Sequence, residues 1–423
     1  MKVIESSNRA AIRRLAAAAA HVDRAFERRI RRIVDAVRRD GDRALLRFAR
    51  QFDGHSGAIE LSRDEMEALA GQVPATVRAA IRASARNIAR VAAQQLPKHL
   101  DVRVAPGVTV EQRVEPLQRV GCYVPGGRFP LPSSLLMTAV PARVAGVREV
   151  VAVCPRREPA VMAAALEAGI TRMFAVGGAH AVAALAYGTR TIPRVDKIVG
   201  PGNKYVATAK TMVATDCAID FHAGPTEIVI VAGGGNAGWT AADLVAQAEH
   251  DPEARAVLVT WNRGFGRRVE NAARSLARRR PIVHEALRRH GAIVIARDRR
   301  DAIAIANLLA PEHLVLERES LLHGPIVAGA VFVGPFTAQA AGDYATGSNH
   351  VLPTAGAARF RGGLHAADFV RVMAVQRLTR DGLARLAATI VPLARAEGLE
   401  AHAESIEIRL ATSTKQRGPS TDL

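Results

Sequence analysis

Two pairs of polar residues combine types that bind metals or transfer protons. Gln247 and His250 lie three positions apart at the predicted end of a helix, so they share one helix face. An amide oxygen and an imidazole nitrogen on that face could bind one metal ion. The alternative is that the pair caps a helix that Pro252 then stops, and the spacing alone favours this alternative.

The second pair is Glu312 and His313, directly before the apolar run 314–316. At the entrance of a strand, both side chains could face a cleft and share proton transfer. Two polar residues at a surface turn would give the same pattern, and the pair alone slightly favours that interpretation. A catalytic role therefore needs support from other parts of the chain.

Two further segments supply candidate donors. Segment 342–350 is a polar loop with two glycines, and loops after strands are where α/β proteins keep their sites. In it, Asp343 offers an oxygen ligand and His350 a nitrogen ligand or donor. Near the C-terminus, Glu397 and His402 offer a carboxylate and another imidazole. Each segment is weak evidence alone, but together a Gln, an Asp and two His could form a zinc site.

The elements that must position these residues follow from periodicity. Residues 8–50 and 63–95 show helical spacing with arginine-rich outer faces. From about residue 148, short β-branched runs alternate with alanine-rich stretches of helical length, which predicts an α/β fold with parallel sheets covered by helices. The runs are 150–153, 228–231, 257–259, 293–295 and 331–333.

Glycine-rich turns follow several of the predicted strands, at 176–178, 199–203 and 232–235. A dinucleotide fingerprint needs a third glycine where a helix opens, but the best candidate has Tyr205 there. A Walker pattern is also absent. The turns therefore indicate only that backbone approaches a phosphate or another turn closely. Any nucleotide site must be built differently from a standard Rossmann site.

Composition limits the class of protein. The 423 residues suffice for two to three domains, and 49% hydrophobic and 23% charged residues exclude disordered, collagenous and small disulfide-stapled chains. Lys+Arg 58 minus Asp+Glu 40 gives a net charge of +18, which is compatible with nucleic-acid binding. Because the arginines are spread out and aromatic residues make up only 4%, nucleic-acid binding is the less favoured class.

Location also follows from composition. Cys122, Cys154 and Cys217 are odd in number and show no C-x-x-C spacing, which indicates a reducing compartment. The alanine run 16–20 is too short and weakly apolar for a secretory signal. No window reaches the roughly 18 apolar residues of a membrane span. We expect a cytoplasmic protein with no membrane partner and a frayed tail at 412–423.

Eight motifs, in order along almost the whole chain, resemble those of the L-histidinol dehydrogenase family. They are specific in residue type, spacing and order, which composition alone does not produce. The motifs are 123–127, 130–134, 199–203, 223–227, 247–250, 311–314, 342–354 and 397–402.

The resemblance implies a zinc-containing, NAD-dependent homodimer that oxidises L-histidinol to L-histidine, the final step of histidine biosynthesis. The reaction would run through bound L-histidinal in two hydride transfers. The implied fold is similar to aldehyde dehydrogenases, with two incomplete Rossmann-like domains. The expected parts are an N-terminal helical arm 1–19, a main α/β domain 20–122 plus 228–364, a second, NAD-binding α/β domain 123–227 and a helical dimerisation segment 365–423.

The resemblance also implies residue roles. His313 would take the alcohol proton, and Glu312 would activate water against the aldehyde. Gln247, His250 and Asp343 would bind one zinc ion per subunit, completed by His402 from the partner. These four ligands and His313 would also contact substrate. The other expected contacts are Ser133, Thr226, His350 and Glu397 for substrate, and Tyr123, His180 and Asn203 for NAD.

Four positions depart from the family pattern. His180 replaces a glutamine and lacks the amide's simultaneous donor and acceptor. Phe129 replaces a small residue, Phe221-His222 replace Met-Pro, and Thr226 replaces a serine. These replacements would affect cofactor affinity and the shape of the substrate site. The alternative to a histidinol-oxidising enzyme is therefore a paralogue that oxidises another small alcohol, such as a sulfonated diol. A decayed enzyme that binds nucleic acid would not need intact ligand and Glu–His positions, yet all are present.

Overall fold

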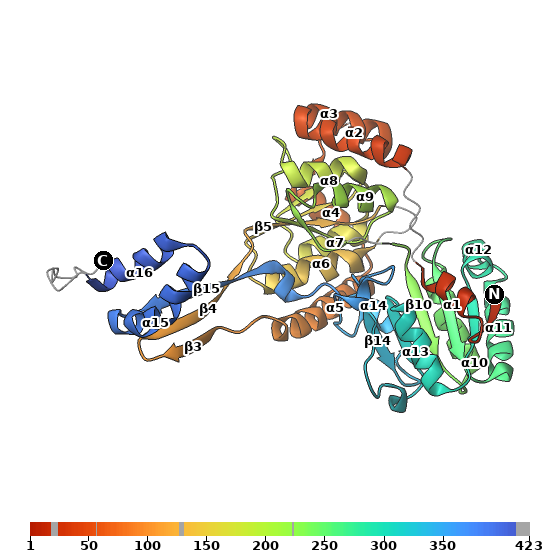
Figure 1. The fold of residues 1–423 in the computed structure, drawn as a ribbon. Helices are drawn as coiled ribbons and strands as arrows, with labels where there is room; N and C mark the ends of the chain where they lie inside the picture. The colour runs from red at the N-terminus through yellow and green to blue at the C-terminus, as the bar shows by residue number, and fades with distance from the viewer. Residues whose placement is uncertain (18–23, 56, 127–130, 222–223, 412–423) are drawn as a thin grey trace. The chain divides into compact units, whose positions relative to one another are not determined.

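The computed structural model describes residues 1–17, 24–55, 57–126, 131–221 and 224–411 (Figure 1). The chain divides into two compact units. The first unit comprises Met1–Leu96 and Leu117–Phe369, and the second comprises Pro97–Pro116 and the chain from Val370 onward. The first unit contains two six-stranded sheets and the second a three-stranded sheet.

The first sheet has the strand order β2-β7-β6-β5-β8-β9. All its neighbouring strands are parallel except the antiparallel pair β2 and β7. After a charged first residue, the central strands are apolar, because helices cover both faces of a parallel sheet. The strands are β2 (Glu60–Leu61), β5 (Arg119–Tyr123), β6 (Glu149–Val153), β7 (Arg172–Phe174), β8 (Lys197–Val199) and β9 (Ala218–Ile219).

The helices around this sheet come from two parts of the chain. Helix α2 packs against α8 and α9, α4 against α7, and α5 against α6 (Figure 1). On α2, the buried Ile30, Ile33 and Val37 form one face and arginines cover the other. The helices are α2 (Arg24–Asp40), α3 (Asp42–Phe48), the π-helix η1 (Ala49–Asp53), α4 (Arg63–Gly71), α5 (Ala75–Gln94), α6 (Pro132–Val144), α7 (Pro159–Glu167), α8 (Gly178–Tyr187) and α9 (Lys204–Val213).

The second sheet is parallel throughout, in the order β1-β12-β11-β10-β13-β14. Its strands are β1 (Lys2–Glu5), β10 (Glu227–Val231), β11 (Arg255–Thr260), β12 (Ala292–Ile295), β13 (His313–Leu316) and β14 (Ala330–Val333). Its helices are α1 (Arg9–Ala16), α10 (Ala237–Ala248), α11 (Arg263–Ala277), α12 (Pro281–Arg289), α13 (Arg299–Leu309) and α14 (Gln339–Tyr344). Short 3-10 turns follow at η2 (Glu319–Leu321), η3 (Ala357–Arg359) and η4 (Ala366–Phe369).

The two sheets share one strand order, although the edge strand β2 is antiparallel and its counterpart β1 is parallel. From β5 or β10 the chain adds two strands on one side, then returns to pair β8 or β13 with the other side of the starting strand. The direction of winding therefore reverses between β5 and β8 and between β10 and β13. Ligands of open α/β sheets bind at such switch points, beyond the carboxyl ends of the strands. The predicted α/β class is confirmed, as are the five predicted strands, which are β6, β10, β11, β12 and β14.

The second unit is built from an antiparallel sheet of order β15-β4-β3 and two helices that pack on each other. The elements are β3 (Leu100–Ala105), β4 (Val108–Pro116), β15 (Val370–Leu378), α15 (Arg380–Ala396) and α16 (Glu400–Ala411). The segment 365–423, expected to be helical, thus contains a nine-residue strand, because β4 offers it a full antiparallel partner. Within the described ranges, no helix is long and apolar enough to cross a membrane.

Candidate active site

Glu312 and His313 lie at the amino end of β13. The parallel register places His313 opposite Ile228 of β10, which brings Glu312 beside the residues that precede β10. Oε2 of Glu312 accepts hydrogen bonds from the Thr226 hydroxyl at 2.5 Å and from the Glu227 amide at 2.9 Å. Because both side chains of the pair are buried, they are not the two surface residues of the alternative interpretation.

The surroundings of Glu312 favour its protonated form. Burial raises the pKa of Glu312 to about 7, although the hydrogen bonds from Thr226 and Glu227 act in the opposite direction. A carboxyl group with this pKa can both accept and release a proton near neutral pH, as a general base requires.

The surroundings of His313 favour its unprotonated, neutral form. Its Nδ1 lies 3.2 Å from the carbonyl oxygen of Glu227. Because a carbonyl only accepts, Nδ1 carries the proton and the neutral ring keeps its lone pair on Nε2. Nε2 is buried without a hydrogen-bond partner among the described residues. Burial lowers the pKa of His313 to about 4, so the ring is neutral at pH 7 and can accept a proton there.

Gln247 presents an unpartnered oxygen close to this pair. It lies on α10, which returns from the carboxyl end of β10, and it is fully buried. Its amide nitrogen donates to the Thr226 hydroxyl. The amide oxygen is therefore turned away from Thr226, and it has no partner in the part of the chain that the structure describes. A buried, unpaired amide oxygen is costly unless a ligand or water satisfies it.

His250 follows the end of α10 and is exposed. Its Nδ1 lies 3.1 Å from the carbonyl oxygen of Ala246 and 3.3 Å from that of Gln247. His250 therefore does cap the helix end, as the alternative interpretation expected. The same contact places the proton on Nδ1 and leaves the lone pair on Nε2, which is how metal-binding histidines are oriented. The two interpretations of this pair are compatible.

Asp343 and His350 lie on the segment after β14. The sequence suggested a loop here, but Asp343 belongs to the short helix α14. That helix packs closely on β14, since a Cβ at Gly342 would lie 2.7 Å from the Phe332 ring. The Gln339 amide donates to Oδ2 of Asp343 at 2.9 Å. His350 Nδ1 lies 3.1 Å from the Asp343 carbonyl oxygen.

His350 also links this segment to α6. Its Nε2 lies 3.4 Å from the hydroxyl of Ser134, the neighbour of the expected substrate residue Ser133. Both serines are buried in the first turn of α6. Burial lowers the pKa of His350, so this ring is also neutral at pH 7. Elements of both sheets therefore meet around these side chains.

The expected ligands act on the proton-transfer pair electrostatically. Burial has the largest effect on the pKa of Glu312, and beyond it His250 lowers that pKa and Asp343 raises it. The same two residues influence the pKa of His313, again after burial. Helices α10 and α14, which carry Gln247 and Asp343, also pack against each other. Gln247, His250 and Asp343 therefore lie around one region at the amino edge of the second sheet.

The donor chemistry of this region fits a zinc ion. Gln247 and Asp343 offer oxygens and His250 an imidazole nitrogen, three of the four donors that zinc takes. Across the described ranges, no three His, Cys, Asp or Glu side chains form a metal-binding group. Of the four expected ligands, His250 and Asp343 are the two of these types in the first unit. The remaining expected donor, His402, is exposed in the first turn of α16, near the exposed Glu397.

Two of the expected NAD contacts lie at the switch point of the first sheet. Tyr123 is the last residue of β5, and its hydroxyl oxygen accepts a hydrogen bond from the Gly178 amide at 3.0 Å. Asn203 follows β8 and is exposed, and its side chain caps α9. The intervening Gly200 has φ +115, and a Cβ there would lie 2.2 Å from the Tyr123 carbonyl oxygen. The two strand ends are therefore in close contact.

The third expected NAD contact, His180, lies within the packing of α8. It is 1% exposed, and its Nε2 lies 2.9 Å from Oδ2 of Asp53. The same carboxylate oxygen accepts the Gly177 amide at 3.0 Å, and the rings of Phe48 and Phe52 lie against the imidazole. One ring nitrogen of His180, Nε2, is therefore already paired within the protein.

The chain is similar to known proteins along most of its length. The family model described as histidinol dehydrogenase matches residues 17–410. The chain belongs to the histidinol dehydrogenase family. It is 46% identical to a histidinol dehydrogenase of Syntrophotalea carbinolica, over 92% of this chain and 93% of the relative. A histidinol dehydrogenase of Nitrosomonas europaea is 43% identical, over 92% of this chain and 93% of the relative.

A solved structure extends the likeness to the fold. The crystal structure of histidinol dehydrogenase from Elizabethkingia anophelis superposes with a TM-score of 0.92 at 31% identity, covering 97% of this chain and 98% of that one. With the family established, the chain is an oxidoreductase.

The structure shows the contacts of two of the residues that depart from the family pattern, Thr226 and Phe221. Thr226 keeps the hydroxyl of the serine it replaces and uses it toward both Gln247 and Glu312. Phe221 is buried, with the Arg361 guanidinium 4.7 Å from its ring centre. Phe129 and His222 lie outside the described residues.

Sequence reasoning missed Glu227, a buried carboxyl at the start of β10. Its backbone contacts both Glu312 and His313, while its side chain accepts the Ala355 amide and pairs with Arg255 at 3.4 Å. Burial raises the pKa of Glu227 to about 7. An acidic residue directly before an all-apolar run was the available signal.

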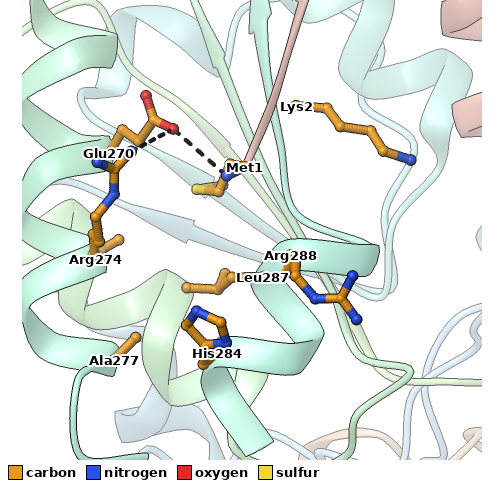
Figure 2. Close-up of a pocket in the computed structure, with 9 residues that line it drawn as sticks. Met1, Lys2, Glu270, Arg274, Ala277, His284, Leu287 and Arg288 are labelled. Carbon is orange, nitrogen blue, oxygen red and sulfur yellow. Dashed lines mark hydrogen bonds and ion pairs between the residues drawn. The ribbon is translucent and has the colours of Figure 1, made fainter. Parts of the chain in front are cut away.

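Figure 2 shows a pocket of about 270 Å³ elsewhere in the first unit, between β1 and helices α11 and α12. The amine of Met1 lies 3.5 Å from Glu270, which also pairs with Arg274. His284 and Leu287 lie opposite Met1, and the Lys2 and Arg288 side chains extend away from them (Figure 2). None of the expected catalytic or ligand residues line it.

Proposed function

We propose that this chain oxidises L-histidinol to L-histidine through bound L-histidinal, with NAD as the electron acceptor. The observation that carries the proposal is the buried pair Glu312 and His313. One has a carboxyl pKa of about 7, and the other is a neutral imidazole whose Nε2 has no partner among the residues described. Oxidation of an alcohol to an acid needs two successive proton acceptors near one carbon.

The two residues divide the proton transfers. His313 accepts the proton of the substrate alcohol at Nε2, the free lone pair. Glu312 then accepts a proton from water as that water adds to the aldehyde, giving the hydrate anion that is oxidised next. When bound, NAD would receive the hydride at each oxidation, and zinc would hold the substrate's nitrogens. The buried surroundings exclude bulk water from the aldehyde.

Gln247, His250 and Asp343 would hold the zinc ion. Support comes from the unpartnered amide oxygen of Gln247 in the described structure and from the His250 tautomer that leaves Nε2 free. We assign the fourth position to His402 of a second copy of the chain. Ser133, Thr226, His350 and Glu397 remain our candidates for substrate contact.

We assign NAD to the first sheet. Tyr123 and Asn203 at its switch point support this assignment, with His180 one layer deeper. The corresponding switch point of the second sheet is less suitable, because the carboxylate of Glu317 already accepts both the Gly233 and Gly234 amides at 2.9 Å. These amides are where a cofactor phosphate would bind.

A homodimer is supported by apolar side chains on the second unit. Leu100, Val102 and Val104 alternate along β3 and are 50–59% exposed, so they share one face of an edge strand. Leu393 and Ile408 on α15 and α16 are exposed as well. Exposed apolar groups of this extent mark interaction surfaces. A second copy that covers them could also bring His402 into the site.

The cytoplasm is our proposed location. All three cysteines are buried and free, which suits a reducing compartment.

The decisive experiment supplies zinc-loaded protein with excess NAD and limiting L-histidinol and follows NADH to completion. Two NADH per histidinol are expected. One NADH would mean that the aldehyde step, and so the role of Glu312, fails. No turnover by folded, zinc-bound dimer would favour the paralogue alternative, which the replacements His180 and Thr226 keep open.

A further inference from the structure

The Thr226 hydroxyl occupies a position between two functional groups of the proposed site. It precedes β10, next to Glu312 at the start of the neighbouring β13, and α10 brings Gln247 to its other side. Gln247 is fully buried, Glu312 is 7% exposed, and Thr226 between them is partly buried. The contacts therefore form a chain from Gln247 through Thr226 to Glu312.

The direction of each hydrogen bond in this chain is fixed by chemistry. An amide NH2 can only donate, so the Thr226 oxygen accepts from Gln247. The single hydroxyl proton of Thr226 is then donated to Oε2 of Glu312. Oε2 also accepts the Glu227 amide, and these two hydrogen bonds together require an unprotonated oxygen. A proton taken up by Glu312 must therefore reside on Oε1.

The hydrogen bond to Thr226 also fixes the orientation of the Gln247 side-chain amide. With Nε2 bound to Thr226, Oε1 faces away from it and has no partner among the described residues. Without the hydroxyl, nothing distinguishes the two ends of the amide at this position, and a rotated amide would present NH2. An NH2 group has no lone pair to offer a metal, whereas the amide oxygen does.

We propose that Thr226 is a positioning residue that sets both the metal-facing oxygen of Gln247 and the proton-accepting oxygen Oε1 of Glu312. The inference rests on the proposed function for the identity of the metal. One lone pair of the Thr226 oxygen remains, so substrate contact and positioning are compatible.

The test measures zinc affinity of the full-length protein by competition with a chelator, without turnover. Thr226→Val removes the hydroxyl at nearly constant shape, and zinc affinity should fall about 10- to 100-fold, as for other residues that orient a ligand. Thr226→Ser should restore it. The control is Thr260→Val, a fully buried threonine of the second sheet whose hydroxyl forms hydrogen bonds only with Asn262 among the described residues. It should leave zinc affinity unchanged.

A double-mutant cycle separates orientation from general damage. Gln247→Glu presents an oxygen in either rotation, so Thr226→Val in that background should cost little zinc affinity. An equal loss in both backgrounds would overturn the inference, as would wild-type affinity in Thr226→Val alone. Thr226→Ala enters the same cycle if the valine variant does not fold. If wild-type protein bound no zinc, the proposed function itself would fail, which is a distinct result.

A second readout tests the Glu312 side. Saturating zinc keeps the Gln247 oxygen on the metal, so the remaining defect of Thr226→Val is the lost hydroxyl donor to Glu312. Thr226→Val should then slow histidinal oxidation more than the first oxidation of histidinol. Equal slowing of both steps would contradict the part of the inference that concerns Glu312.

Discussion

Glu312 and His313 are adjacent in the chain, yet burial moves their pKa values in opposite directions, to about 7 and about 4. Burial disfavours the charged form of either group, so it favours the protonated carboxyl of Glu312 and the neutral imidazole of His313. At neutral pH the imidazole is ready to accept a proton, and the carboxyl is near its midpoint. Two acceptors with different pKa values suit two successive deprotonations.

Glu312→Gln tests this division. The amide keeps the size of the side chain but cannot accept a proton, so histidinal oxidation should fall about 10²- to 10⁴-fold. NADH formation in the first turnover with histidinol should change far less. Rapid-mixing measurements with each substrate check this result. Equal loss of both half-reactions would show that Glu312 is not specific to the aldehyde step.

The pH dependence of the two steps should also differ. Below a pKa of about 7 the Glu312 carboxyl is protonated and cannot act as a base, so histidinal oxidation should decline about tenfold per pH unit there. His313, with a pKa of about 4, stays neutral, so the first oxidation should lack this limb above pH about 5. Parallel pH profiles provide the measurement. The limb should vanish in Glu312→Gln, and its persistence would assign it to another group.

At the scale of elements, the sequence located the pieces of the site but not their contacts. Gln247 and His250 at a helix end and Glu312 and His313 at a strand entrance were predicted from local patterns, and α10 and β13 confirm both placements. The contact of Thr226 with Gln247 and Glu312 depends on which strands are neighbours and in which register. No local pattern carries that information, because pairing partners lie about 86 residues apart in the chain.

The loop after β8 illustrates an element held by a buried charge pair. Lys210 and Asp220 are each 3% exposed and form an ion pair. The Lys210 ammonium also donates to the Gly200 carbonyl at 3.0 Å, and Asp220 accepts the Gly200 amide at 2.8 Å. Both backbone groups of Gly200, close to the proposed NAD contact Asn203, thus depend on this pair.

Lys210→Met should therefore destabilise the protein by about 3–5 kcal/mol, because it leaves the Asp220 charge buried without its cation. Urea denaturation gives the free energy of unfolding. The control is Lys204→Met on the same helix, where the lysine is exposed, and it should change that free energy little. If the two variants were equally stable, the buried pair would not anchor the loop. NADH affinity, measured by fluorescence, should fall in Lys210→Met.

At the scale of the whole molecule, two sheets of the same strand order differ in their switch points. In the first sheet, Tyr123 and Asn203 lie at the strand ends. In the second sheet, the Glu317 carboxylate accepts hydrogen bonds from the amides of Gly233 and Gly234. The sequence predicted the α/β class but grouped 20–122 with 228–364, while the described helices of 24–94 pack on helices of the first sheet. Periodicity shows which helix face is buried, not which sheet buries it.

Shared sites across a dimer lead to the last prediction. His402→Ala and Asp343→Ala should each be nearly inactive as pure proteins. If His402 serves the partner's site, a heterodimer of the two variants holds one site with both residues intact and one site with neither. Random exchange makes half of the dimers mixed, so about a quarter of wild-type activity should return on mixing. If each His402 served its own chain, no intact site could form and mixing would restore nothing. Activity and bound zinc after subunit exchange, each against the unmixed variants, distinguish the two arrangements.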